Sequence, residues 1–287
     1  HQRPFVLRGL AGRWPAARVW SWRSLADPRG PYTELGKVPA LEAIFPPSGR
    51  PLAQDGALFL DGLLARPPLS EDCPLGAMSG QDGNRAGLLG ENFLPRLNQA
   101  WLAALAKAKA EGLVDQKFEA AESIHNYVIA GPAGSGGMLH MDPEATAFWN
   151  ALVHGRKRWM FLRPEDIGAL AAALKRASGA LLEQILKLAA NGTRRPRQLS
   201  SASLRKILQK IPALKWFGEL IPLLRDAGIN FPHEEVVVSG GDIVYGPPGV
   251  FHIVLSLEDS IGCSEQLVDE GNLIKFVRNE EEDFESM

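Results

Sequence analysis

The alternation of apolar and polar positions divides the chain into short strands and one block of helices. The strand-like runs are rich in β-branched and aromatic residues, and glycine or proline stands between them. They occupy residues 4–10, 124–129, 146–153, 157–162, 236–245 and 251–257. Short strands separated by turn signals at this density predict a β-sandwich or a β-barrel.

A helical block interrupts this β pattern between residues 164 and 228. It opens with Pro164-Glu165-Asp166, which places a proline in the first turn and acids at the positive end of the helix dipole. Apolar residues then recur at spacings of three, four and seven, at Ile167, Leu170, Leu174, Leu181, Ile185 and Leu188. The stripe predicts one amphipathic helical stretch that ends at Asn191-Gly192.

Further helices are predicted by the same periodicity. A second helical set follows from Ser203 and is interrupted by Pro212 and Pro222, because proline cannot donate the backbone hydrogen bond of a helix interior. Upstream, residues 18–25 and 97–112 are helix candidates. The proline and glycine residues between 31 and 90 favour short strands and loops there.

Two consecutive strand candidates, joined by a turn at His154-Gly155, are predicted to form a hairpin. Alternate residues of a strand share a face, and here these faces hold Phe148, Asn150, Leu152, Lys157, Trp159 and Phe161. A lysine among aromatic and aliphatic side chains is costly unless it meets an anion. The pattern leaves two placements open for Lys157, either on this inner face or on the outer face beside Arg156 and Arg158.

Composition and charge narrow the class of protein. The 287 residues are 45% hydrophobic and 22% charged, which excludes a mainly disordered or collagen-like chain. A net charge of −2 gives no overall basic signature for nucleic acid, and no apolar run is long enough to cross a membrane. The two cysteines, Cys73 and Cys263, cannot form a disulfide framework and favour a reducing compartment. We therefore expect an intracellular protein of the nucleus or cytoplasm.

The strongest candidate for chemistry is His140-Met141-Asp142 together with His252. Because residues i and i+2 of a strand point to the same side, His140 and Asp142 can offer an imidazole nitrogen and a carboxylate oxygen to one point. His252 follows a tight Gly-Pro-Pro-Gly turn and would add a third ligand from a distant strand. Two histidines and one carboxylate leave positions open on an octahedral metal, which suits Fe(II), whereas a structural zinc site closes them. The alternative is a chance His-x-Asp triplet whose histidines are only hydrogen-bonded.

Several stretches in this order resemble the JmjC branch of the cupin-fold, Fe(II)- and 2-oxoglutarate-dependent oxygenases. The best match is Trp149-Asn150-Ala151-Leu152-Val153 with Gly155-Arg156-Lys157-Arg158-Trp159, which is most similar to the lysyl hydroxylases and proposed arginine demethylases. The remaining matches are residues 3–10 with Trp14, residues 91–94, 131–136 and 140–143, and the stretch from Gly241-Asp242 to His252. The resemblance covers most of the chain outside the helical block and the acidic C-terminal tail.

The resemblance implies a mainly β fold with a double-stranded β-helix (jelly roll) core. Residues 123–279 would form this JmjC core, and residues 164–229 would be a helical insertion in it. Residues 1–122 would form an N-terminal mixed α/β region that packs on the core. Residues 280–287 would be an acidic tail.

The resemblance also implies the roles of individual residues. His140, Asp142 and His252 would bind Fe(II) as the catalytic metal ligands. Lys157 would pair with the distal carboxylate of 2-oxoglutarate, Asn150 would line the cosubstrate site, and Ser264 would hydrogen-bond the cosubstrate. One position departs from the family: Gly137 stands three residues before His140, where a threonine is usual, and Ser135 is the nearest substitute hydroxyl.

The implied activity is hydroxylation or demethylation of a protein side chain, with release of succinate and CO2. One alternative is the same chemistry on RNA or a small molecule. Another, motivated by Gly137, is a binding module that keeps the fold without catalysis. The helical block carries 11 basic and 5 acidic residues, so it could recognise an acidic protein or an RNA. Without interleaved aromatic residues we favour a helical pair that packs its leucines on the β core.

Overall fold

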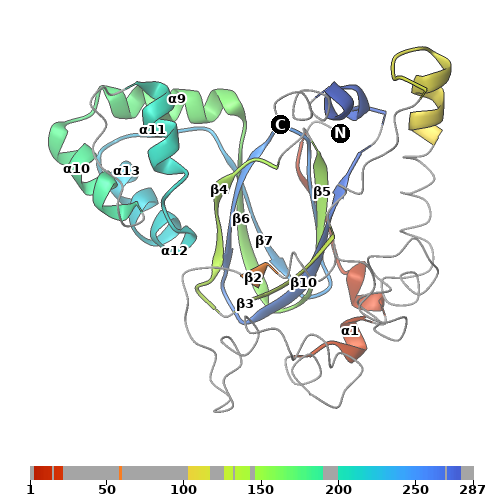
Figure 1. Ribbon diagram of the computed structural model, residues 1–287. Coiled ribbons are helices and arrows are strands. Elements are labelled where there is room, and N and C mark those ends of the chain that lie inside the picture. The colour runs from red at the N-terminus through yellow and green to blue at the C-terminus, as the bar shows by residue number, and fades with distance from the viewer. Residues whose placement is uncertain are drawn as a thin grey trace.

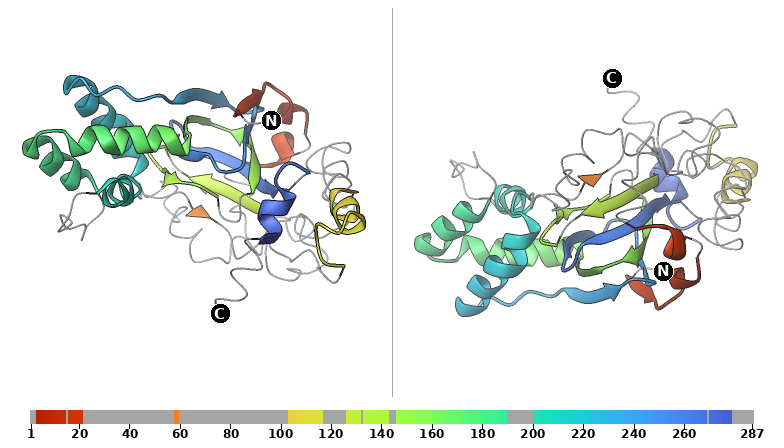
Figure 2. Two further views of the ribbon diagram at one scale, coloured as in Figure 1. Left: turned by 90° about the horizontal axis from the view of Figure 1, so that it is seen from above. Right: turned by 90° about the horizontal axis from the view of Figure 1, so that it is seen from below.

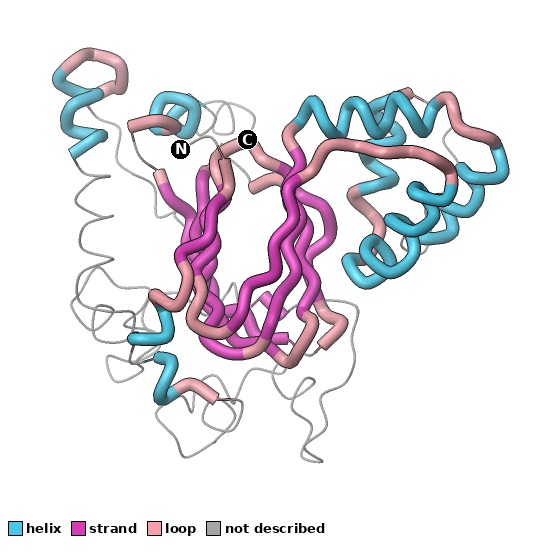
Figure 3. The backbone as a smooth tube through the Cα atoms, turned by 180° about the vertical axis from the view of Figure 1, so that it is seen from behind, coloured by secondary structure: helices cyan, strands magenta, loops and turns pink. Residues whose placement is uncertain are grey.

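The computed structural model describes residues 3–14, 16–21, 58–59, 103–116, 126–131, 133–142, 146–189, 200–268 and 270–278. Two antiparallel sheets face each other, and helices pack outside them (Figures 1 and 3). The predicted segment at 91–94, most of the helix candidate at 18–25 and the acidic tail lie outside these residues. Within them, none of the helices combines the length and the hydropathy that crossing a membrane requires.

The larger sheet has six strands and the smaller sheet has four. The six-stranded sheet runs in the order β1 (Phe5–Leu7), β8 (Ile243–Gly246), β5 (Ala147–His154), β10 (Ser260–Leu267), β3 (Asn126–Gly131) and β2 (Leu58–Phe59). The four-stranded sheet runs in the order β4 (Gly136–His140), β9 (Phe251–Ser256), β6 (Arg156–Leu162) and β7 (Glu234–Ser239). Successive segments cross between the sheets, so residues far apart in sequence share one interior.

The predicted hairpin between 146–153 and 157–162 is wrong, although the residues predicted to share a face of each strand do so. β5 is bordered by β8 and β10, and β6 is bordered by β9 and β7, so neither strand has an edge left for the other. The turn at Gly155 has a φ of +87° and carries the chain from one sheet to the other. A Cβ atom at Gly155 would collide with the carbonyl of Asp259. The two faces therefore meet across the interior of the molecule instead of lying side by side.

The strand predicted at 236–245 is also divided between the sheets. β7 ends at Ser239 and β8 begins at Ile243, with Gly241 at a φ of +97° between them. Two strands were not predicted from the pattern. β4 begins inside the glycine-rich run, and β10 contains glycine, serine, glutamate and glutamine, which weaken an alternating signal.

The helical block lies between β6 and β7. It contains α9 (Pro164–Lys175), α10 (Gly179–Leu188), α11 (Ser201–Leu208), α12 (Ala213–Lys215), the π-helical turn η3 (Trp216–Leu220) and α13 (Ile221–Asp226). The single stretch predicted from Pro164 is two helices, because Ser178 caps α10 by accepting a hydrogen bond from the Leu181 amide.

Pro222 shapes the next part of the block. Its nitrogen cannot donate to the carbonyl four residues earlier, and its ring crowds that carbonyl. The chain adapts by a wider turn, in which the Ile221 amide donates to the Trp216 carbonyl. The helical path therefore continues through the proline instead of breaking there.

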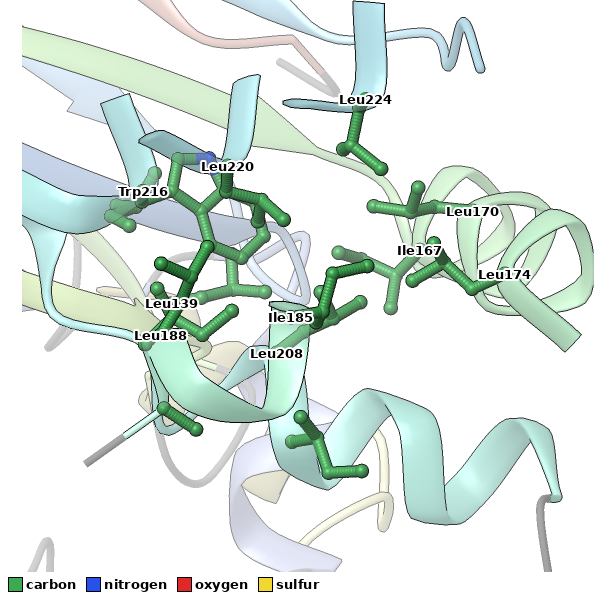
Figure 4. Close-up of a cluster of buried hydrophobic side chains, with 14 of the residues drawn as sticks. Leu139, Ile167, Leu170, Leu174, Ile185, Leu188, Leu208, Trp216, Leu220 and Leu224 are labelled. Carbon is green, nitrogen blue, oxygen red and sulfur yellow. The ribbon is translucent and has the colours of Figure 1, made fainter. Parts of the chain in front are cut away.

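These helices cover the outer face of the four-stranded sheet. Outward residues of that sheet, such as Leu139 and Ile253, form one buried cluster with Leu208, Trp216 and other helical side chains (Figure 4). Seen from above and below, the helices lie on one side of both sheets (Figure 2). The packing interpretation of the helical block is thus confirmed for the described helices, and Trp216 is a core residue.

A smaller helical cluster lies at the other side of the molecule. The helix at 103–110 packs against the helix at 273–278 through Leu105, Ala108, Leu273 and Phe276. The first helix overlaps the predicted candidate at 97–112. The short helix α1 (Ala16–Val19) lies near β5, where the Trp14 and Trp149 rings meet edge to face.

Replacing Leu208 by alanine tests how far the helical block belongs to the core. Leu208 is fully buried, so Leu208→Ala should lower the free energy of unfolding by about 2–5 kcal/mol in urea titrations. The control is Leu214→Ala, which removes a side chain that is 50% exposed and should cost less than about 1 kcal/mol. Equal effects of the two substitutions would contradict a shared core.

Candidate metal centre and its pocket

Three of the predicted residues converge at one end of the facing sheets. His140 ends β4 and stands opposite His252 of β9 in the strand register, and Asp142 follows two residues later. The ligand atoms of the three side chains all lie within 4.8 Å of one another. An Oδ1 atom of Asp142 is 3.7 Å from His140 Nε2 and 3.9 Å from His252 Nε2. The two imidazole Nε2 atoms and the carboxylate thus surround a common centre.

Backbone carbonyls set the orientation of both imidazoles. His140 Nδ1 lies 2.7 Å from the Met138 carbonyl, and His252 Nδ1 lies 3.4 Å from the Val250 carbonyl. A carbonyl can only accept, so each Nδ1 donates its proton to the carbonyl, and Nε2 is the ring nitrogen left to face the centre. Such support fixes both the tautomer and the ring direction that a metal ligand requires.

Burial tunes the protonation of the centre. It holds the pKa of His252 well below its ordinary value, with the neighbouring His140 acting in the same direction. Burial also raises the pKa of Asp142, against the opposing effect of His140. The imidazole of His252 is therefore neutral, the form that binds a cation. A bound cation would favour the ionised carboxylate of Asp142 and reverse its shift.

Aromatic rings surround His252 on the inner side. The Phe148 ring centroid, on the facing sheet, is 4.6 Å from that of His252, and the Trp159 and Phe161 centroids on β6 are 6.0 Å and 6.3 Å from it. The His252 side chain is only 5% exposed, whereas His140 is 42% exposed. The centre is thus closed on the β9 side and open to solvent on the β4 side.

All six predicted site residues line one pocket. It extends inward from the triad, and its other walls include Ile129, Gly137, Phe148, Trp159, Val254, Ser256 and Gln266. The strand registers set the depth of each residue. His252 stands at the level of Phe161, whereas Lys157 stands opposite Ser256, four residues deeper along β9. At about 3.3 Å per residue, the two levels are ~13 Å apart along the strand.

Lys157 lies on the inner face, which settles the alternative that the sequence left open. It is 3% exposed, while Arg156 and Arg158 on the outer face pair with Glu258 and Glu235. In the part of the chain that the structure describes, no carboxylate pairs with Lys157. Burial lowers the pKa of Lys157 to about 8. Among the described residues, the buried cation at the deep end of the pocket therefore has no carboxylate partner.

Asn150 and Ser264 occupy the middle of the pocket, opposite each other on β5 and β10. Ser264 Oγ donates to the Trp149 carbonyl at 2.8 Å, which leaves its lone pairs available. The Oδ1 atom of Asn150 is buried and has no hydrogen-bond partner among the described residues. A buried amide oxygen of this kind is suited to a ligand or water donor.

Two polar residues of the pocket were not predicted from the sequence. Ser256 lies four residues after His252, and Gln266 lies two residues after Ser264. Strand alternation from those predicted residues would have found both. Gly137 lines the pocket, and a Cβ atom there would lie 3.4 Å from His140 Cε1. Ser135, the suggested substitute hydroxyl, is buried but is not part of the pocket wall.

Comparison with known proteins agrees with this arrangement. No protein-family model matches the chain. A lysine-specific demethylase of Arabidopsis thaliana, JMJ21, is 24% identical over 273 residues, which cover 94% of this chain and 24% of the relative. An arginine-specific demethylase of the same plant, JMJ22, is 23% identical over 150 residues, or 52% of this chain and 24% of the relative. The chain is a distant homologue of the JmjC demethylases.

A third sequence match is to a protein whose name gives two activities. The bifunctional arginine demethylase and lysyl-hydroxylase psr-1 of Caenorhabditis elegans is 45% identical over 40 residues, 14% of this chain and 10% of the relative. The chain spans about a quarter of the length of the two plant relatives. The combination of distant homology and a His-Asp-His centre supports the oxygenase chemistry considered next.

Replacing Lys157 by methionine tests the buried cation through the pH dependence of stability. In the unfolded chain its pKa returns to the ordinary 10.5, so between pH 8 and 10.5 the unfolded state binds a proton that the folded state has released. Wild-type stability therefore rises with pH in this window. Relative to Lys157→Met, the wild type should gain on the order of 3 kcal/mol.

Urea unfolding at a series of pH values measures this gain. The control is Lys175→Met, which alters an exposed lysine on α9 and should leave the difference from wild type constant with pH. Parallel curves for wild type and Lys157→Met would contradict a desolvated cation at the deep end.

Proposed function

We propose that the chain is an Fe(II)- and 2-oxoglutarate-dependent oxygenase that hydroxylates or demethylates a protein side chain. One observation carries the proposal: a triad that can hold a metal and a buried lysine that has no carboxylate partner among the described residues stand at opposite ends of the same pocket. The first end suits a metal with open positions, and the second end suits an anion. A dicarboxylic acid that reaches the metal can satisfy both.

The donor set fits iron. Two imidazole nitrogens and one carboxylate oxygen form the ligand face that non-haem Fe(II) oxygenases use. Among the described residues, no fourth histidine, cysteine or acidic side chain joins the cluster. Positions therefore stay open for a cosubstrate, whereas a structural zinc site has all four positions filled by protein.

The pocket fits 2-oxoglutarate. One end of this acid would lie at the metal, and its distal carboxylate would pair with Lys157, which removes the cost of burying an unpaired ammonium. Asn150 and Ser264 would hold the middle of the acid. When bound, iron would supply, together with 2-oxoglutarate and O2, the hydroxylation of a C–H bond: one oxygen atom of O2 goes to that carbon, the other goes to succinate, and CO2 is released.

The residues of the chain itself exclude water from the centre and position the substrate. Phe148 and Trp159 form an apolar wall that keeps water from the inner side of the centre. Substrate would approach over the exposed His140, where Met138 and Met141 are also exposed. A side chain held there would present its C–H bond to the centre at close range, which is the main contribution a protein makes to such chemistry.

The fold and substrate follow the same proposal. The two sheets would form a double-stranded β-helix core at 123–279, with the helical block at 164–229 as its insertion and 1–122 packed beside it. The names of the relatives refer to lysine and arginine demethylation and to lysyl hydroxylation, so a basic side chain of a protein is the proposed target. We expect this target in the nucleus or cytoplasm.

Asp142→Ala tests the enzyme. With Fe(II) and 2-oxoglutarate the wild type should form succinate, and the variant should fall to background because one of three metal ligands is lost. Asp226→Ala changes an exposed aspartate and should retain turnover. Metal binding without succinate under any condition would favour a non-catalytic module instead.

Mass spectrometry of the acceptor tests the substrate. Peptide libraries that contain lysine and arginine, with and without methyl groups, are compared with RNA. Addition of one oxygen atom or loss of a methyl group on a peptide is the expected result. Modification of RNA alone would overturn the protein substrate while leaving the oxygenase chemistry in place.

Lys157→Ala tests the cosubstrate site. Loss of the buried ammonium should raise the KM for 2-oxoglutarate by about tenfold or more, because a charge-assisted hydrogen bond is removed. Mn(II) binding, followed by electron paramagnetic resonance, should be unchanged. Lys175→Ala is the matched surface control. An unchanged KM in Lys157→Ala would remove this residue from its proposed role.

A further inference from the structure

A pair of buried hydroxyl groups lies beside Lys157 at the deep end of the pocket. Lys157 and Ser256 stand directly opposite each other on the paired strands β6 and β9, and both line the pocket. Each is 3% exposed. Opposite residues of antiparallel strands place their Cβ atoms about 4.5–5.5 Å apart on the same face. The two side chains therefore start from neighbouring backbone positions, and both line the pocket.

A second hydroxyl supports the first from behind. Ser260 is fully buried, and its Oγ lies 3.0 Å from Ser256 Oγ and 3.4 Å from the Gly131 carbonyl. Because the carbonyl can only accept, Ser260 donates to Gly131, and Ser256 then donates to Ser260. In this arrangement the Ser256 oxygen offers lone pairs, which suit the ammonium of Lys157 but not an anion.

The backbone fixes both hydroxyl groups. The Ser256 amide donates to the Ser135 carbonyl at 2.7 Å, and the Ser256 carbonyl accepts from the Gly134 amide at 2.8 Å. On the other side, a Cβ atom at Gly155 would lie 2.9 Å from the Ser260 Cβ. Three segments thus hold the backbone around the pair, and the hydroxyl groups reorient by side-chain rotation.

We propose that Ser256 and Ser260 form a hydroxyl relay that, with Lys157, binds the distal carboxylate of the cosubstrate and selects a dicarboxylic acid. This inference rests on the proposed function. A carboxylate has two oxygens that both need donors, and a single ammonium approaches from one side. When the acid enters, Ser256 turns its proton to the second oxygen. Ser260 then donates to Ser256 and gives up its long hydrogen bond to Gly131.

The position of the relay distinguishes it from the other polar groups of the pocket. Phe148 of β5 contacts His252, and Asn150 lies two residues farther along β5, opposite Ser264. These two polar groups therefore face the middle of an extended acid. Ser256 is level with Lys157 and faces the far end. Its loss should weaken only those ligands that carry a second carboxylate.

Isothermal titration calorimetry of the full chain loaded with Mn(II) tests this selectivity without turnover. The two ligands are 2-oxoglutarate and 2-oxobutyrate, which has the same keto-acid end but no distal carboxylate. Ser256→Ala should weaken 2-oxoglutarate binding by about tenfold, as expected for a hydrogen bond to a charged group, and leave 2-oxobutyrate within about twofold. Ser256→Thr, which keeps the hydroxyl, should retain most of the preference for 2-oxoglutarate.

Two further variants make the result specific. Ser260→Ala removes the supporting hydroxyl outside the pocket wall and should weaken 2-oxoglutarate by a smaller factor, about two- to fivefold. Ser239→Ala removes an exposed hydroxyl at the end of β7 and should change neither ligand. Thermal unfolding of every variant shows that the chains compared are folded.

The outcomes separate the relay from the function on which it rests. If Ser256→Ala weakens the binding of both acids equally, or of neither, the relay is overturned. The proposed function still stands in that case if the wild type binds 2-oxoglutarate. Failure of the wild type itself to bind 2-oxoglutarate would overturn both. Loss confined to the dicarboxylic acid, with rescue by threonine, supports the relay.

Discussion

The antiparallel pairing of β4 with β9 is the constraint on which the site depends. It sets His140 opposite His252, and the same two-residue alternation continues along β9 to Val254 and Ser256. Pairing of β9 with β6 then brings Lys157 to the level of Ser256. A slip of one residue in either pairing would turn these polar side chains toward the helices. One pair of strand registers thus places both the metal centre and the anion end of the pocket.

The helical block stabilises the sheet that carries these polar side chains on its inner face. A sheet with a lysine and two histidine-bearing strands on its inner face needs a strongly apolar outer face. Leu139, Met160 and Ile253 provide it, and α9 to α13 bury them from outside. The helices therefore stabilise the strands that carry the ligands without contributing a residue to the pocket wall. Their basic residues remain on the outer surface of the molecule.

Much of this arrangement could be predicted from the sequence, because period-two alternation survives in β5, β6 and β9. The facing sets Phe148 to Leu152 and Lys157 to Phe161 were correct for that reason. The predicted pairing of these two strands was wrong. A tight glycine turn has the same sequence signal whether the next strand pairs with the previous one or crosses to the other sheet. β10 was missed because small and polar residues line the pocket there. The convergence of His140, Asp142 and His252 was predicted from the sequence. The depth of Lys157 in the pocket became known only from the registers of the paired strands.

The unequal exposure of the two histidines has a consequence for how an ion is exchanged. His252 is held among aromatic rings, whereas the His140 side chain reaches solvent. A bound ion would be reached from the side of His140 and Asp142, because both side chains are more exposed than that of His252. Chelators and histidine-directed reagents would act from the same side. The end of β4 would therefore be the segment through which a bound ion is exchanged.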